Sequence, residues 1–276
     1  MFPERIETER LVLEALTHEN VDVFELYQHN AHDAPDIDEV TEFVPWEPHA
    51  TPKETKDFID AAAKNRAEGE GAEFLIRLQE GEKGTSSHDT GTDEIVGLAG
   101  INVEWERRTG TLGIGLRKPF WGRGYSGERA DALIELAFET LDLELVAVDH
   151  FDGNEKSKRA IEKYVEAHGG QYDGILRNWY PDGDDVRDAH RYTVTREQWL
   201  ENREKKKAVT RSRSHDRPLP RTPRNGSAGA GTTVSRKRRY YRLVSTLFAP
   251  RGNRGGDEIS HVGPPRHAEG NARFRH

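Results

Sequence analysis

The stretch FWGRGYS, residues 120–126, decides the fold of this chain. Gly122 and Gly124 remove two side chains directly before an amphipathic segment. Without those side chains, the backbone N–H groups of residues 122–126 can all point at one anion, and the positive end of a following helix dipole adds to the attraction. Taken alone, such a glycine pair is also typical of an ordinary turn. Placed before a helix, it predicts a seat for a pyrophosphate.

The residues around the loop predict a fixed order of elements. A strand over Thr111–Leu116 leads into the loop, and the segment ELVAVDHF, residues 144–151, predicts another strand. NEKSKRAIEKY, residues 154–164, predicts a helix with Asn154 as its N-cap. The helix after the loop carries apolar residues at helical spacing, namely Ala130, Leu133, Ile134, Ala137, Phe138 and Leu141. The order is strand, anion loop, helix, strand, polar turn, helix.

At these residues the chain resembles the GNAT superfamily of acyl-CoA-dependent N-acetyltransferases, and within it the RimJ/RimL-like branch. That branch shows K-P-x-W-G-x-G-Y-A before a helix, then a strand, then N-x-x-S-x-R-x-x-E-K. The resemblance extends over roughly residues 8–200, from ETERLVLEALT to RYTVTREQW. The matching residues are Lys118, Pro119, Trp121, Gly122, Gly124, Tyr125, Asn154, Ser157, Arg159, Glu162 and Lys163.

The remaining pattern predicts one α/β domain, a mixed central sheet flanked by helices. Apolar or alternating runs predict strands from Arg10, over 74–78, over 95–103, over 172–179 and over 189–194. Helical spacing marks 18–29 and a helix opened by Pro52. Residues 79–94 contain no apolar side chain and predict a mobile hairpin loop, and residues 180–188 predict a turn-rich connection.

Charge divides the chain near residue 201. Residues 1–201 hold 22 Lys and Arg against 44 Asp and Glu, whereas residues 202–276 hold 19 basic and 5 acidic groups. We therefore expect an acetyltransferase domain over 1–201 and a basic, Arg/Pro/Gly-rich disordered tail over 202–276. The tail is either an arm with weak RNA contact or a frame-shifted or read-through extension without selected function. The acidic, lysine-poor domain resembles proteins of salt-loving organisms, with an ordinary acidic protein as the alternative.

The absence of cysteine excludes a disulfide scaffold, a thiolate nucleophile and a zinc-ribbon site. No apolar run approaches about 18 residues, and the N-terminus is unlike a signal peptide. We expect a cytoplasmic protein with no membrane contact.

The resemblance implies that acetyl-CoA inserts between two splayed strands, here 111–116 and 144–151, with no metal required. It implies that the pyrophosphate lies on Gly122, Gly124 and Ser126, shaped by Trp121 and Tyr125. It also implies positive charge against the phosphates from three side chains, those of Arg117, Lys118 and Arg123. Arg123 and Lys118 can equally be solvated loop charges, and packing or loop shaping is the more usual role of the two aromatic residues.

For the chemistry, the resemblance places Asn154 and Ser157 at the thioester or pantetheine end. Ser157 is the candidate acid for the leaving thiolate, with Tyr164 as the alternative. Many relatives carry a Glu on the strand before the loop, where this chain has Thr111. Glu104 is then a candidate base acting through water, although an exposed ion pair is the simpler interpretation. An α-amine with a pKa of about 8 can also react without a dedicated base.

Three function classes remain open. The first is N-acetylation of a protein N-terminal α-amine, as in ribosomal-protein alanine acetyltransferases. The second is acetylation of a small amine such as an aminoglycoside, a polyamine or an amino acid. The third is a CoA-binding or RNA-associated module without catalysis. An acidic groove with Glu42, Glu47 and Asp185 near the acceptor mouth would suit a cationic acceptor in the first two.

Overall fold

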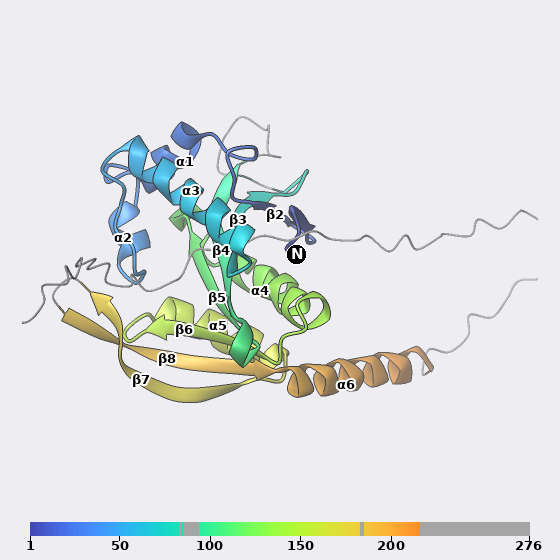
Figure 1. Ribbon diagram of the computed structural model, residues 1–276. Helices are drawn as coiled ribbons and strands as arrows, with labels where there is room; N and C mark the ends of the chain where they lie inside the picture. Colours follow the sequence, from blue (N-terminus) through green and yellow to red (C-terminus); the bar gives the residue numbers. More distant parts are fainter. Residues whose placement is uncertain (83, 85–93, 183–184, 216–276) are drawn as a thin grey trace, which may run out of the picture.

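An eight-stranded sheet forms the centre of the molecule in the computed structural model, which describes residues 1–82, 84, 94–182 and 185–215 (Figure 1). The strands lie in the order β1-β2-β3-β4-β5-β6-β8-β7. Every neighbouring pair is antiparallel except β5 and β6, which are parallel. The strands are β1 Arg5–Glu7, β2 Leu11–Ala15, β3 Gly71–Leu78, β4 Ile95–Glu104, β5 Thr109–Leu116, β6 Leu145–Phe151, β7 Gln171–Asp182 and β8 Asp185–Thr195.

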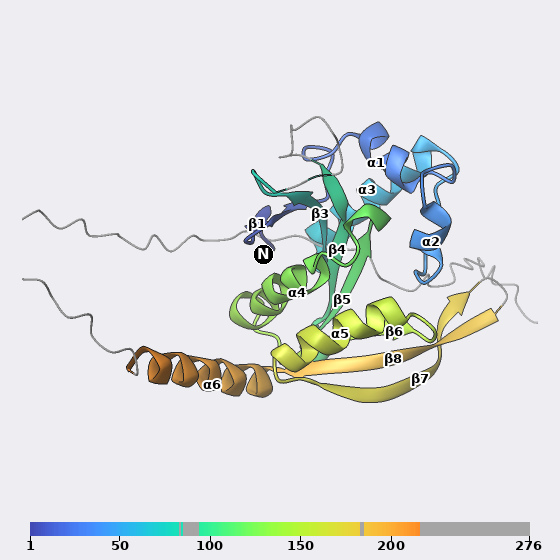
Figure 2. The same cartoon turned by 180° about the vertical axis from the view of Figure 1, so that it is seen from behind.

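Helices cover both faces of this sheet, which confirms the predicted α/β fold. Helix α3 crosses in front of the sheet in Figure 1, and helices α4 and α5 lie in front of the sheet in the reverse view of Figure 2. The α-helices are α1 Val23–Asn30, α2 Ile37–Thr41, α3 Pro52–Glu68, α4 Tyr125–Glu135, α5 Glu155–Ala167 and α6 Arg196–His215. Two 3₁₀ turns, η1 Trp105–Arg107 and η2 Lys118–Phe120, and one π-helical turn, η3 Leu136–Thr140, complete the set.

Side-chain alternation along the strands builds a separate core on each face. In β3, Phe74 and Ile76 pack into the large cluster shared with α4 and α5, whereas Leu75 between them packs with Ile59 of α3. Successive strand residues point to opposite faces, so one strand can serve both layers. The buried apolar area on both faces explains why β3 and β4 are apolar with little polar alternation.

The parallel strands β5 and β6 pair only over four residues each. Their register runs from Thr109↔Leu145 to Leu112↔Val148 and stops there. Beyond this point β5 stays paired with β4 as far as Leu116, and β6 stays paired with β8 as far as Phe151. Each strand is therefore held by its outer neighbour while the inner edges separate, and the sheet opens at this position.

The last two strands extend further than the sequence pattern predicted. β7 continues to Asp182 and β8 begins at Asp185, so both enter the predicted connection at 180–188. Pro181 pairs with Val186 in this extension. Proline is compatible with β7 because β7 is an edge strand, where one backbone N–H is not needed for the ladder. The extension carries Tyr180 toward the opening between β5 and β6.

Two other sequence expectations fall wholly or partly outside the described residues. The predicted hairpin loop at 79–94 includes residues 83 and 85–93, and the predicted tail includes residues 216–276, none of which is described. Helix α6 runs without interruption across the predicted boundary at residue 201. None of the helices in the described part of the chain has the length and apolar character needed to cross a bilayer.

Glu128 connects the glycine loop to the N-terminal strands. Its carboxylate accepts hydrogen bonds from the Thr8 hydroxyl at 2.6 Å, from the Arg10 backbone N–H at 2.6 Å and from Arg10 Nε at 2.8 Å. Arg10 in turn donates to the backbone oxygen of Arg123 in the loop at 2.9 Å. Burial opposes ionisation of Glu128, but these hydrogen bonds outweigh it and lower the pKa overall.

Replacing Glu128 by Gln is expected to lower the free energy of unfolding by about 1–3 kcal/mol at pH 7, because three hydrogen bonds lose their charged acceptor. Since the pKa of Glu128 is lower in the folded state, its contribution is present above the unfolded value of about 4.3 and is lost as the pH falls through the folded value. Urea titrations at pH 7 and pH 3 measure this difference. Asp57→Asn, in the exposed Lys53–Asp57 pair, is the control and should change little. Equal unfolding free energies for Glu128→Gln and the parent at pH 7 would contradict the assignment.

Candidate active site

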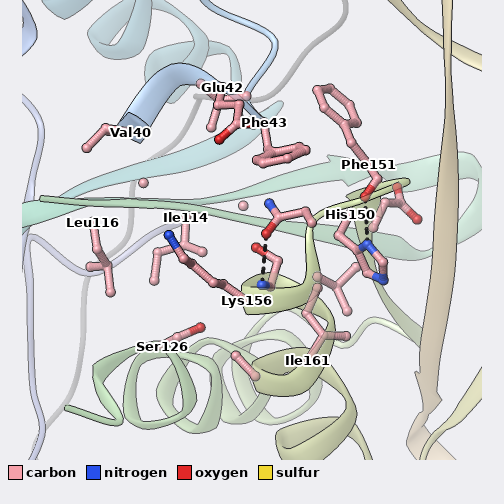
Figure 3. A pocket seen from close by; sticks show the side chains of 18 of the residues that line it. Val40, Glu42, Phe43, Ile114, Leu116, Ser126, His150, Phe151, Lys156 and Ile161 are labelled. Atoms are coloured by element: carbon pink, nitrogen blue, oxygen red, sulfur yellow. Dashed lines mark hydrogen bonds between the residues drawn. The ribbon is translucent and has the colours of Figure 1, made fainter. Parts of the chain in front are cut away.

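A cavity of about 470 Å³ lies where β5 and β6 separate (Figure 3). In Figure 3, Val40, Glu42 and Phe43 lie on one side of the strands, and Ser126, Lys156 and Ile161 of α4 and α5 lie on the other. The cavity is thus lined from both faces of the sheet. The lining residues that carry polar or aromatic side chains are Glu39, Glu42, Phe43, Thr111, Trp121, Ser126, Asp149, His150, Phe151, Asn154, Lys156, Ser157, Tyr164 and Tyr180.

The two glycines of the loop have left-handed backbone conformations. Gly122 and Gly124 have φ values of 75° and 84°, which lie in the left-handed region that residues other than glycine rarely adopt. Gly124 is the N-cap residue of α4. Trp121 fixes the entry to the loop, because its indole Nε1 donates to the backbone oxygen of Leu116 at 2.8 Å. The first turn of α4 therefore presents its free N–H groups beside the cavity.

The structure brings some of the predicted cofactor residues to the cavity and leaves others outside its lining. Trp121, Gly122, Ser126 and Asn154 line it. The other predicted cofactor residues do not line the cavity, namely Arg117, Lys118, Arg123, Gly124 and Tyr125. Tyr125 is buried at 1% exposure, and its hydroxyl donates to Glu82 at 2.7 Å, so it shapes the loop from behind. Arg123 stacks with its guanidinium carbon 5.1 Å from the centre of the Phe120 ring.

Lys118 binds carboxylates of α2 and the turn before it. Its Nζ donates to Asp36 at 2.9 Å and also to Glu39. The hydrogen bond to Glu39, followed by that to Asp36, raises the pKa of Lys118. In this structure Lys118 therefore joins η2 to α2, and the phosphate role that the resemblance implied would require it to leave these partners. Its position fixes the α2 segment over one side of the cavity.

Asn154 and Ser157 meet at the start of α5, beside the cavity. Asn154 is the N-cap, and its Oδ1 accepts a hydrogen bond from the backbone N–H of Ser157 at 3.0 Å. This is the geometry of an N-cap side chain bonding to the third helical residue. Asn154 thus fixes the backbone of Ser157, and the Ser157 side chain lies in the lining of the cavity.

The structure does not bring Glu104 to the cavity. Glu104 ends β4, pairs in register with Thr109 at the beginning of β5, and has a side chain 54% exposed that binds Arg107 at 2.9 Å. The separation of the strands lies beyond Leu112, several residues further along β5. The prediction of Glu104 as a base is therefore corrected. Of the predicted acidic groove, Glu42 lines the cavity, whereas Glu47 and Asp185 do not.

Asp149 was missed by the sequence analysis and is the most deeply enclosed acid of the cavity. It follows Val148, the last residue of β6 that pairs with β5. Its side chain is 3% exposed, and its Oδ1 has no hydrogen-bond partner among the described residues. Burial raises the pKa of Asp149 to about 6, against the opposing effects of Arg191 and Trp179. The only signal in the sequence was an acid inside the apolar run of residues 144–151.

Lys156 and Tyr164 were not among the predicted binding residues and also line the cavity from α5. Lys156 Nζ lies 4.1 Å from the centre of the Trp121 ring, so it places a positive charge against the glycine loop. Burial raises the pKa of Tyr164 to about 12, although the neighbouring Arg129 lowers it. Tyr164 therefore keeps its proton at neutral pH.

Comparison with known proteins agrees with this geometry. The family model described as "Acetyltransferase (GNAT) domain" matches residues 10–164. A Bacillus licheniformis protein named "Uncharacterized N-acetyltransferase p20" is 26% identical over 177 residues, which cover 64% of this chain and 87% of that protein.

Solved structures show the same fold at low sequence identity. A GCN5-related N-acetyltransferase from Brucella melitensis superposes with a TM-score of 0.59 and 18% identity, over 75% of this chain and 86% of that one. RimL, described as a ribosomal L7/L12 alpha-N-protein acetyltransferase, superposes with a TM-score of 0.56 and 15% identity, over 71% of this chain and 96% of that one.

Replacing Asn154 by Ala is expected to lower the free energy of unfolding by about 0.5–2 kcal/mol, because α5 loses its cap. Thermal and urea unfolding of the full chain measure the loss. Asn154→Ser is the matched control, since a serine hydroxyl can also accept from the third helical N–H. If Ala and Ser variants unfold alike and both match the parent, the cap has no energetic role.

Proposed function

Because this chain belongs to the GNAT acetyltransferase family, we propose that it transfers the acetyl group of acetyl-CoA to a primary amine, and that this amine is the α-amine of a protein N-terminus. The observation that carries the proposal is a single cavity that joins a glycine loop on one face of the sheet to carboxylates on the other. The glycine loop suits a pyrophosphate, and the carboxylates suit an ammonium group.

The cosubstrate side of the cavity is formed by α4 and α5. The free N–H groups at the start of α4 can receive the pyrophosphate, and Lys156 adds a positive charge from the facing helix. The inner edge of β5 beyond Leu112 has no partner among the strands that the structure describes, so its backbone can pair with the amide groups of the pantetheine arm. Acetyl-CoA that is bound by these groups would have its thioester near Asn154 and Ser157.

The acceptor side is formed by the α2 segment and the end of β7. Glu42 and Asp149 line this side together with Glu39, which also forms an ion pair with Lys118, and Tyr180 lines it from β7. The negative charges of these carboxylates attract an ammonium group and raise its local concentration. An α-amine with a pKa of about 8 is partly neutral at pH 7–8, whereas a lysine side chain with a pKa of about 10.4 is almost wholly protonated. An N-terminus is therefore the more reactive acceptor here.

The motif residues support a place in the RimJ/RimL-like branch. Lys118 to Tyr125 and Asn154 to Lys163 carry the pattern of that branch. RimL itself shares only the fold with this chain at 15% identity, and its name describes a protein α-N acceptor. The acidic composition of residues 1–201 supports assays in high salt, where screening reduces repulsion between surface carboxylates.

The test is acetylation by the full chain in high salt, with acetyl-CoA and a panel of acceptors. The panel contains peptides with free N-termini, the same peptides with blocked N-termini and an internal lysine, and small amines including an aminoglycoside and a polyamine. Mass spectrometry locates the added acetyl group. Acetylation of free N-termini alone supports the proposal, and turnover confined to small amines would overturn the acceptor assignment.

Gly124→Val should weaken acetyl-CoA binding, because a left-handed conformation costs a non-glycine residue about 1–2 kcal/mol and the loop must shift to avoid it. Titration calorimetry measures the affinity. Gly127→Ala, in the first turn of α4, is the control and should bind like the parent, because a Cβ added at this position would meet no atom within 4 Å. Unchanged affinity of the Gly124→Val protein would show that the loop does not hold the cosubstrate.

Ser157 supports protonation of the departing thiolate. It lies on the lining at the start of α5, held by the Asn154 cap, and its hydroxyl can donate a proton to sulfur as the C–S bond breaks. Tyr164 lies on the same lining and is the alternative donor, because burial raises its pKa to about 12 and it keeps its proton at neutral pH.

Ser157→Ala is therefore expected to lower turnover by about 10- to 1000-fold while acetyl-CoA affinity stays nearly the same. Steady-state kinetics and calorimetry separate the two quantities. Lys158→Ala, one residue further along α5 and outside the lining, serves as the control. If Ser157→Ala keeps full turnover across the pH range, the proton for the departing thiolate comes from Tyr164 or from water.

A further inference from the structure

Asp149 is the one acid whose side chain is enclosed at the point where β5 and β6 separate, among the residues that the structure describes. It lines the cavity one residue beyond the last β5–β6 pair, Leu112↔Val148. We infer that the Asp149 carboxylate accepts the proton that the acceptor ammonium loses before it attacks the thioester. This inference rests on the proposed acetyl transfer and adds a residue that performs one step of it.

The alternation of β6 places Asp149 on the acceptor side of the sheet. Val146 and Val148 pack into the core shared with α4 and α5, so Ala147 and Asp149 face the opposite side. By the same rule Leu112 faces the α4 and α5 core, and Thr111, the register partner of Ala147, faces the side of Asp149. The glycine loop and Ser157 approach from the α4 and α5 side. An amine that arrives beside Asp149 would thus reach a thioester held on the other face through the separated strands.

The contacts of Asp149 leave part of its carboxylate available. Arg191 Nη1 of β8 lies 3.8 Å from Oδ2, longer than a hydrogen bond, and the Trp179 side chain hydrogen-bonds to the carboxylate. Oδ1 has no hydrogen-bond partner among the described residues. A buried carboxylate oxygen without a hydrogen bond is destabilising in a folded protein. An ammonium group or a water bridging to it would supply the missing partner, which points to a ligand at this position.

The acid strength of Asp149 suits this step. Burial raises its pKa to about 6, so the carboxylate is ionised at neutral pH yet binds a proton more readily than an exposed aspartate. The groups that face it are Arg191 of β8 and Trp179, Tyr180 and Asp173 of β7, while Tyr164 of α5 interacts with its charge from the other face of the sheet. Arg191 and Trp179 favour the ionised form, and Asp173 opposes it.

The proton and electron balance is as follows. The carboxylate, directly or through one water, takes a proton from the ammonium, and the freed lone pair forms the N–C bond while the carbonyl electrons move to oxygen. Return of these electrons breaks the C–S bond. Ser157 gives its hydroxyl proton to the sulfur, which leaves as CoA thiol, and the second proton of the amine restores the Ser157 hydroxyl. The proton on Asp149 passes to solvent. The products are the N-acetyl amine, CoA thiol and one proton.

The test is Asp149→Asn in the full chain, with the peptide or amine that the acceptor screen identifies. Turnover should fall by about 10²- to 10⁴-fold, acetyl-CoA affinity should persist, and the acidic limb of the parent kcat/KM profile near pH 6 should disappear. Asp149→Glu should recover part of the turnover because it restores a carboxylate. Asp152→Asn, whose side chain is 80% exposed and outside the lining, removes the same charge and should leave the profile unchanged.

Arg191→Gln adds a measurement that a purely structural role would not affect. Since Arg191 lowers the pKa of Asp149, its loss should move the acidic limb to higher pH. Thermal melting gives a readout without catalysis. The pKa of Asp149 is higher in the folded state, so stability falls as the pH rises from the unfolded value of about 3.9 and the loss is complete above about pH 6. Asp149→Asn should therefore melt at a higher temperature than the parent at pH 8, with the difference lost below about pH 4.

Each result decides the assignment. An acidic limb that is lost in Asp149→Asn and shifted in Arg191→Gln supports it, and if the Asn variant fails to fold, the Glu and Arg191 variants carry the same test. Unchanged turnover and profile in Asp149→Asn, with an active parent, would overturn the role of Asp149 alone. A parent that acetylates no amine would overturn the proposed function and this inference together.

Discussion

The separation of β5 from β6 is the constraint on which the rest of the structure depends. Hydrogen bonding joins the two strands only as far as Leu112 and Val148, and then each strand follows its outer neighbour, β4 or β8. Backbone groups on the inner edges are left without strand partners, and such groups are costly unless a ligand or water satisfies them. The large core on the α4 and α5 face keeps both strands in place, so the opening is a fixed feature of the fold. A cavity that reaches both faces follows directly.

Charge is distributed so that each side of the opening suits one substrate. On the α4 and α5 side, a helix N-terminus and Lys156 favour an anion, and on the other side Glu39, Glu42 and Asp149 favour a cation. Lys118 and Glu128 hold this arrangement together, because Lys118 links η2 to α2 and Glu128 links α4 to Arg10. Lys118, which the resemblance suggested for phosphate binding, thus connects the loop to a neighbouring element in this structure.

Sequence reasoning predicted the fold well because its signals were local. The glycine loop, the apolar face of α4 and the Asn154 cap are each encoded within a few residues, and the structure has all three. The extended β7 could not be predicted, since Pro181 and the acidic residues around it read as a turn, and only the edge position of the strand makes them compatible with a sheet. Glu104 was misplaced because its distance from the opening depends on strand register. Asp149 was missed because burial, not residue type, distinguishes it from the many surface acids of this chain.

The central claim is that acetyl-CoA occupies the opening between β5 and β6, and hydrogen exchange measured by mass spectrometry tests it most directly. Saturating acetyl-CoA should slow amide exchange at residues 113–116 of β5 and at residues 122–126 of the loop, and should leave α3 unchanged. Slowing confined to the second cavity, of about 250 Å³ and lined by His29, Trp46 and Arg117, or no slowing at either β5 or the loop, would contradict the account.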